Sequence, residues 1–224
     1  MSVAVRRAHT AADRRLWTRW VAWVTVGEAI GFTVPAVVGA ATVGRPLQVW
    51  LPALLAAGAV EGALLGAAQA HVLSGVVPAL FRTRWVLATS AAAVFAYAIG
   101  LTPSASSELV GEWPVAVIVA AAVILGTALL LSIGFAQWLV LPAHVDRAAS
   151  WIWVTAVAWL VGLTIFMVVA TPLWREGQAV AVTVLIGVGA GLLMAASVAA
   201  VTGLGVVAIR RRVDSVPGHD NGSP

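Results

Sequence analysis

Six long stretches of the chain are apolar and almost free of charge, and short polar segments separate them. A helix rises about 1.5 Å per residue and the hydrocarbon layer of a bilayer is about 30 Å thick, so each stretch is long enough to cross it. The stretches cover residues 20–41, 49–73, 85–101, 113–141, 151–171 and 178–209, and Pro103 marks the end of the third. The pattern predicts an all-α, polytopic bundle of six transmembrane helices.

The first stretch has an alternative interpretation as a secretory signal peptide, because the small residues VVGAA at 37–41 are similar to a cleavage site. Its apolar part is longer than the usual signal-peptide core of about 7–15 residues. The internal repeat described below also requires a helix here. We therefore expect a membrane span.

The arginines indicate an orientation. Eleven of the thirteen lie before the first stretch, after the second or fourth stretch, or at the C-terminal end of the chain. The three other connections hold Arg45 and Arg175, and they also carry Glu108, Glu112 and Glu176. Because basic residues are enriched in cytoplasmic loops, both termini are predicted to lie in the cytoplasm.

This orientation divides the chain into three parts. We expect a cytoplasmic segment at 1–16, a transmembrane domain at 17–212 and a polar, disordered cytoplasmic tail at 213–224. All basic residues are arginine, beside abundant alanine, valine and glycine, which is typical of a GC-rich bacterial genome. The expected location is a bacterial plasma membrane.

Composition excludes several classes of protein. With 61% hydrophobic residues, 10% charged residues and a mean hydropathy of +0.99, the chain is too apolar for a soluble globule, so the lipid bilayer is its expected partner. It has no cysteine, which excludes disulfides and thiol chemistry. The isoelectric point is about 11.3, but the arginines lie at the ends of apolar stretches and form no patch with stacking aromatic residues. Nucleic acid is therefore not an expected partner.

Tryptophans and glutamines recur along the chain and indicate an internal repeat. Trp20, Trp85 and Trp151 open the odd-numbered stretches at spacings of 65 and 66 residues. The even-numbered stretches align on GAAQAHVL at 66–73, GFAQWLVL at 134–141 and AAVTGLGV at 199–206, which places Gln69, Gln137 and Thr202 at matching positions. The repeat predicts three parallel helical hairpins, at about 17–73, 82–141 and 148–209, related by an axis near the membrane normal.

Small residues recur at every fourth position of the even-numbered stretches, for example Gly58, Gly62 and Gly66. Residues four apart share a helix face, and small ones let two backbones approach closely. We expect the even-numbered helices to form a packed core.

Most of the eleven tryptophans lie near the ends of the stretches, where an amphipathic indole favours the headgroup region. The expected role of these residues is an interfacial belt. Its members are Trp17, Trp20, Trp85, Trp138 and Trp151 on the cytoplasmic side and Trp50, Trp113 and Trp174 on the other side. Trp159, in the middle of a stretch, is an exception.

Three segments resemble a family of uncharacterised actinobacterial integral membrane proteins, in which a GEAIGF-like segment opens the chain and G-x-A-Q-W-x-V-L segments recur. The segments are VGEAIGFTVPAVVG at 26–39, VEGALLGAAQAHVL at 60–73 and GFAQWLVL at 134–141. The second segment departs from the pattern, because Ala70-His71 stands where the third has Trp138-Leu139. The resemblance implies a polytopic membrane protein and no particular activity.

Two carboxylic acids lie within apolar stretches. Glu28 is nine residues beyond Arg19 and Glu61 is eleven beyond Trp50, so both are expected near the middle of the bilayer. A charged carboxylate is costly there, so each must be protonated, paired or hydrated. The equivalent repeat positions hold Ala93 and Trp159 for Glu28, and Leu129 and Met194 for Glu61. Because acidity is confined to the first hairpin, we favour a functional role over a neutral glutamic acid bonded to a structural partner.

Polar residues continue from Glu61 toward the predicted cytoplasmic end. Gln69 lies eight residues further along the same helix face, His71 follows it, and Gln137 matches Gln69 in the second hairpin. One hypothesis is a polar path from the middle of the membrane to the cytoplasm. The alternative is that the amides join helices by hydrogen bonds and that His71 is an interfacial residue. The candidate site residues are Glu28, Glu61, Gln69, His71 and Gln137.

No metal site, cofactor or catalytic residue is predicted. The chain has four histidines, two of them near its ends at His9 and His219, which is a poor supply of converging ligands. It contains no P-loop, G-x-S-x-G or H-E-x-x-H motif. The glycines of GVGAG at 187–191 lie within an apolar stretch and follow no strand, so they are interpreted as packing residues.

Three functions fit these observations. The first is a small transporter or ligand-binding membrane protein, whose intramembrane carboxylates hold a proton or the cationic group of a small-molecule or lipid ligand. The second is a non-catalytic structural or accessory subunit that forms a homo-oligomer or binds another membrane protein. The third is a membrane-embedded acid–base enzyme acting on a lipid or isoprenoid, and the absence of a nucleophile or phosphate-binding motif disfavours it.

Overall fold

The structure is a computed structural model that describes residues 3–77, 79–106, 113–141, 145–175 and 177–215, with the backbone alone for residues 3–9, 180 and 215. Six α-helices in these residues are each long and apolar enough to span a membrane. They are α1 (Val3–Ala41), α2 (Leu47–Leu73), α3 (Arg82–Ala105), α5 (Val115–Trp138), α6 (Ser150–Leu173) and α7 (Val180–Ser215). The prediction of an all-α, six-helix membrane protein is confirmed.

The helix ends follow from proline and glycine. Pro46 and Pro114 are the N-caps of α2 and α5, where the missing N–H costs no helical hydrogen bond. Gly44 (φ 72°) and Gly177 (φ 73°) reverse the chain after α1 and α6 in a left-handed conformation that strains other residues. Pro103 lies inside the last turn of α3, which continues to Ala105, so that helix is longer than its apolar stretch predicts.

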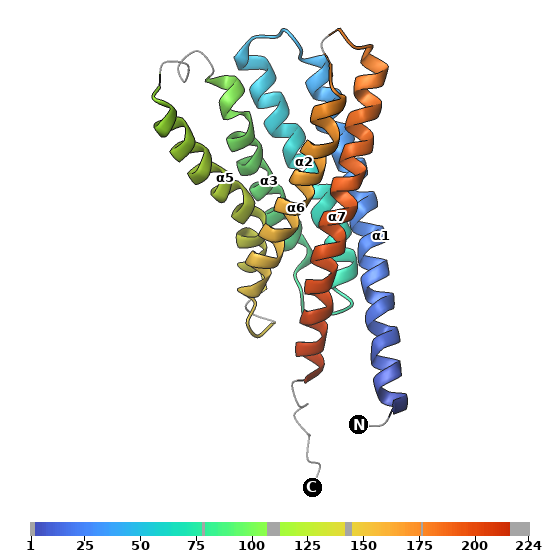
Figure 1. Cartoon of the computed structure of the whole chain (residues 1–224). Helices are drawn as coiled ribbons and strands as arrows, with labels where there is room; N and C mark the ends of the chain where they lie inside the picture. Colours follow the sequence, from blue (N-terminus) through green and yellow to red (C-terminus); the bar gives the residue numbers. More distant parts are fainter. Residues whose placement is uncertain (1–2, 78, 107–112, 142–144, 176, 216–224) are drawn as a thin grey trace.

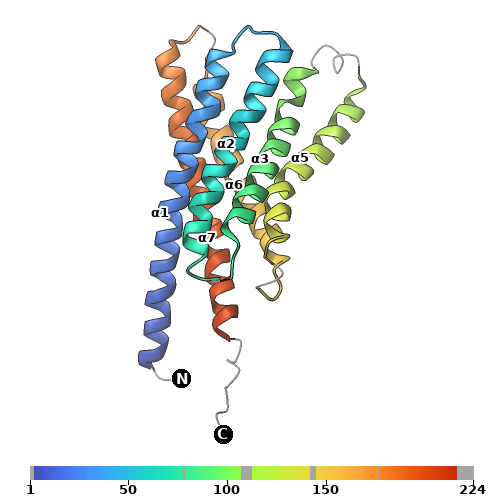
Figure 2. The ribbon, with the colours of Figure 1, turned by 180° about the vertical axis from the view of Figure 1, so that it is seen from behind.

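Each helix packs against its neighbours in the chain and α7 packs against α1, so the six helices close into a ring (Figures 1 and 2). Both termini lie at one end of the ring, which we call the terminal end. The α1–α2 and α6–α7 connections lie at the other end, which we call the hairpin end. The helices fan apart toward the hairpin end, and α5 leans out farthest in both views.

An ion-paired cluster joins the first and last helices at the terminal end. Asp13 is buried, with Oδ1 3.1 Å from Nη2 of Arg210 and Oδ2 2.7 Å from Nη2 of Arg211. A buried carboxylate requires such partners, and loss of either side would leave an uncompensated charge. The cluster therefore fixes α1 against α7 beyond their apolar parts.

The small residues of α2 pack against α3, and those of α5 pack against α6. A Cβ atom on Gly62 would lie 2.5 Å from Cβ of Ala93 on α3, and one on Gly134 would lie 2.9 Å from the carbonyl oxygen of Ile152 on α6. In chain order, α2, α5 and α7 are the second, fourth and sixth helices. They alternate around the ring with the first, third and fifth helices, so the prediction that the even-numbered helices form a packed core is wrong. Close approach occurs between ring neighbours instead.

The first half of α5 stands apart from the rest of the ring. Residues 122–125 are four consecutive exposed residues, and at about 3.6 residues per turn they point to all sides of the helix. The buried residues of α5 are Ile133, Gly134 and Gln137, all near its C-terminal end. This helix is therefore anchored at the terminal end and largely exposed toward the hairpin end.

Two glycines of α5 provide a matched test of this packing. We expect Gly134→Ala to lower the free energy of unfolding by about 1–3 kcal/mol, because the added methyl group meets the α6 backbone. Gly126 has nothing within 4 Å of an added Cβ, so Gly126→Ala should leave stability unchanged or raise it by up to about 1 kcal/mol through helix propensity. Thermal unfolding in detergent measures both, and equal effects of the two substitutions would contradict the α5–α6 contact.

Candidate functional site

Three tryptophans meet inside the ring. Trp20, Trp85 and Trp151 are at most 2% exposed, and the Trp151 ring lies 6.1 Å from Trp20 and 6.0 Å from Trp85 between centroids. The prediction that these three belong to an interfacial belt is therefore wrong. Trp113 and Trp174 are exposed, as a belt requires.

Each buried indole donates a hydrogen bond to the polar residue of another helix. Trp85 Nε1 donates to Gln69 Oε1 (3.1 Å), Trp151 Nε1 to Gln137 Oε1 (2.8 Å) and Trp20 Nε1 to Thr202 Oγ1 (3.0 Å). An indole N–H is stable in a core when it finds such an acceptor. The bonds join α2 to α3, α5 to α6 and α7 to α1.

Gln137 connects two of these pairs. Its Nε2 donates to Gln69 Oε1 at 2.7 Å and to Thr89 Oγ1 at 2.9 Å, and the whole residue is buried. Gln69 and Gln137 therefore join helices, as the hydrogen-bonding interpretation of these amides predicts. We call Trp20, Trp85, Trp151, Gln69, Gln137, Thr89 and Thr202 the tryptophan–glutamine cluster.

His71 lies apart from this cluster. Its ring is exposed, 4.5 Å from the Trp23 ring between centroids, and its Nε2 lies 3.4 Å from Nη2 of Arg19. On α2 the buried, apolar Leu65 separates Glu61 from Gln69. The structure therefore brings Gln69 and Gln137 together, but it places His71 on the outer surface.

A cavity of about 280 Å³ lies inside the ring, on the hairpin side of the tryptophan–glutamine cluster. Glu28, Ala93 and Trp159 in its wall each follow a cluster tryptophan by eight residues, or about 12 Å along a helix. All six helices contribute to the wall, which includes Glu28, Phe32, Glu61, Leu65, Ala93, Tyr97, Gly100, Leu129, Ile133, Trp159, Leu163, Phe166 and Met194. The cluster thus closes the ring at one end of the cavity.

Glycines bring Glu28 and Glu61 together from α1 and α2. A Cβ atom on Gly27 would lie 2.5 Å from Cβ of Ala68, and one on Gly31 would lie 3.2 Å from Cα and O of Glu61. Gly27 and Gly31 are four residues apart on one face of α1, the spacing that allows two membrane helices to approach closely. The carboxyl groups of Glu28 and Glu61 consequently interact with each other inside the cavity.

Tyr97 on α3 completes this acidic site, and it is not among the residues predicted from the sequence. Its hydroxyl group donates a hydrogen bond to Oε2 of Glu61. Gly58 makes room for the ring, because a Cβ atom there would lie 2.6 Å from Cδ2 of Tyr97. The available signal was that Tyr97 is the single tyrosine of the chain and lies within an apolar stretch.

Glu28 has a less satisfied environment than Glu61. It is 2% exposed, and within the described part of the chain neither of its carboxyl oxygens makes a hydrogen bond of good geometry. Burying an ionisable group without a partner is costly in an apolar medium. The neighbouring Glu61 carboxyl group can share a proton with Glu28 but brings no positive charge, since both groups are acids.

The remaining wall is apolar and aromatic. Phe32, Tyr97, Trp159 and Phe166 contribute rings from α1, α3 and α6. In the described residues no three histidine, aspartate or glutamate side chains come together. The side-chain oxygen atoms in the cavity wall belong to two carboxyl groups and one phenol. The arrangement suits an apolar molecule that carries one hydrogen-bonding or cationic group.

Comparison with protein-family models, curated proteins and solved structures gives no match to this chain. The resemblance to actinobacterial membrane proteins therefore assigns neither a family nor an activity. Function has to be inferred from the cavity and the residues around it.

The cluster can be tested at Gln137. We expect Gln137→Leu to lower the free energy of unfolding by about 1–3 kcal/mol, because the Trp151 N–H loses its acceptor in a buried site. Gln48→Leu, at an exposed position of α2, is the matched control and should have little effect. Thermal unfolding with tryptophan fluorescence as the readout measures both. Equal stability of the two variants would show that the amide bonds do not hold the ring together.

Proposed function

We propose that this protein is a small ligand-binding membrane protein or transporter, in which Glu28 and Glu61 hold a proton or a cationic group. The observation that carries the proposal is the buried Glu28 carboxyl group, which lines a cavity and has no partner among the described residues except another acid, Glu61. A carboxyl group in this position is costly unless something else satisfies it. A bound ligand would supply the missing partner.

We propose also that the ring consists of three related hairpins, and this relation strengthens the functional interpretation. The positions that the repeat aligns with the two acids line the same cavity, namely Ala93, Trp159, Leu129 and Met194. Apolar side chains fill all four, so packing at these positions does not require an acid. The acids of the first hairpin are better explained by what the cavity binds.

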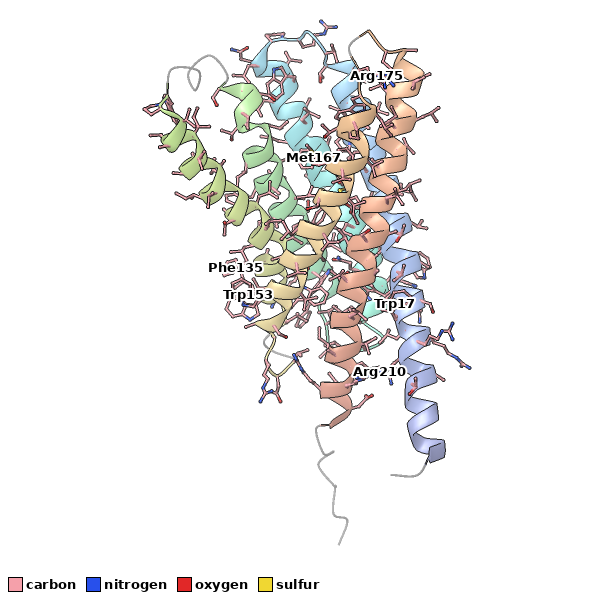
Figure 3. All side chains as sticks on the ribbon, viewed as in Figure 1. Trp17, Phe135, Trp153, Met167, Arg175 and Arg210 are labelled. Carbon is pink, nitrogen blue, oxygen red and sulfur yellow. The ribbon has the colours of Figure 1, made fainter. Side chains whose placement is uncertain are left out.

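The terminal end is proposed to face the cytoplasm of a bacterial cell. Arg210 lies at the terminal end and Arg175 at the hairpin end (Figure 3). Arg14, Arg15, Arg19, Arg211 and Arg212 lie in the same terminal parts of α1 and α7 as Arg210, which gives that end the greater share of positive charge. In this orientation the hairpin end, toward which the helices fan apart, faces outward.

Filling the cavity should abolish ligand binding. Gly100 lines the cavity and an added Cβ would meet nothing within 4 Å, so Gly100→Trp places a large ring there without a clash at the backbone. We expect a panel of small apolar amines, alcohols and acids to contain compounds that stabilise the wild-type protein in thermal unfolding but not Gly100→Trp. Gly126→Trp adds the same side chain outside the cavity and should behave as wild type. If no compound gives a stabilisation that depends on Gly100, the binding function is contradicted and the accessory role is favoured.

The absence of native cysteine allows a direct test of orientation. Val43, 81% exposed beside the α1–α2 connection, and Thr83, exposed at the start of α3, are suitable positions for single cysteines. We expect a membrane-impermeant maleimide to label Val43→Cys in intact cells and Thr83→Cys only after permeabilisation. The reverse pattern of labelling would show that the termini face outward.

A further inference from the structure

We infer that the cavity binds an apolar organic monocation, whose ammonium group lies against Glu28 and Glu61 and whose apolar body fills the aromatic part of the cavity. This inference rests on the proposed function of the cavity and names the class of its ligand.

The acidic end of the cavity selects for positive charge. Two carboxyl groups lie side by side, and the described residues of the cavity wall contain no arginine or histidine to balance them. Oε2 of Glu61 already accepts a hydrogen bond from Tyr97, whereas Glu28 has no partner among the described residues except the Glu61 acid. One ammonium group supplies positively charged donors to the two carboxyl groups, and charge-assisted hydrogen bonds of this kind are the strong ones. An anionic ligand would meet two acids.

The rest of the cavity selects for an organic cation. Mg²⁺ takes about six oxygen ligands and Ca²⁺ about six to eight, and the cavity wall offers either ion two carboxyl groups and a phenol on an otherwise apolar surface. The rings of Phe32, Trp159 and Phe166 offer apolar surface and ring faces, which attract an organic ammonium ion. A sugar or another polar molecule would find few partners beyond the three acidic-site residues.

The contribution of α5 to the cavity wall comes from one half of the helix. Leu129 and Ile133, in the second half of α5, line the cavity, whereas residues 122–125 are exposed on all sides of the helix. Gly100 of α3 and Phe166 of α6 lie at positions nearer the hairpin end, where α5 leans away (Figures 1 and 2). Because the site lies between membrane-spanning helices and its wall is mostly apolar, the ligand class is one that partitions into membranes.

A pair of probes with the same shape and different charge tests this inference. 1-Adamantylammonium and 1-adamantanol share one apolar cage and differ in the polar group. Their binding is measured by isothermal titration calorimetry on the full chain in lipid nanodiscs, with empty nanodiscs subtracted. We expect the ammonium compound to bind at least about tenfold more tightly than the alcohol, as a charge-assisted hydrogen bond predicts.

Variants assign the difference to Glu28. Glu28→Gln should reduce the affinity for 1-adamantylammonium to that for 1-adamantanol. The affinity for 1-adamantanol should stay unchanged, and this unchanged binding also shows that the cavity of the variant is folded. Glu28→Asp should retain a preference for the cation, and Asp146→Asn, at an exposed carboxylate outside the cavity, should bind as wild type.

The outcomes separate the two proposals. Equal affinities for the two probes, or a preference for the cation that survives Glu28→Gln, would overturn the assignment of ligand class. The proposed binding function would still stand if compounds of the panel stabilise the protein in a way that depends on Gly100. If neither probe binds and no compound of the panel depends on Gly100, both proposals fail.

Discussion

The hydrogen bonds of the tryptophan–glutamine cluster are the interaction on which the arrangement of the ring depends. Lipid is as apolar as the helix surfaces, so apolar surface alone gives transmembrane helices little reason to associate in one order. Buried indole and amide groups must find partners inside the protein, and here each buried tryptophan finds one on a neighbouring helix. Together with the Asp13 ion pairs, these bonds fix the helices at the terminal end.

The cavity follows from this one-sided attachment. Because the helices are joined near the terminal end, they are free to diverge toward the hairpin end, and α5 diverges most (Figure 1). The space between them begins about two helical turns beyond the cluster tryptophans, at the level of Glu28. Two groups of buried polar residues are therefore separated along the helix axes: amides and indoles at the closed end, carboxyl groups and a phenol in the cavity.

Several residues had different surroundings from those that their positions in the sequence suggested. Trp20, Trp85 and Trp151 lie at the ends of apolar stretches, where an indole is equally suited to the headgroup region or to a buried site with an acceptor. The sequence could not distinguish these, because the acceptors Thr202, Gln69 and Gln137 belong to other helices. The small residues of α2 presented the same difficulty, since a close-packing face does not identify the helix that packs on it.

The amino-acid sequence by itself determined the number of membrane-spanning helices, their approximate ends and the presence of two acids in the first two spans. These properties depend on local hydrophobicity and on helix rise per residue, which can be read along the chain. The tertiary structure alone decided that the helices form a ring, that Glu28 and Glu61 share a cavity with Tyr97, and that His71 lies outside it. Those outcomes depend on the rotation of each helix about its axis and on the choice of its neighbours, which interhelical contacts determine and local sequence does not.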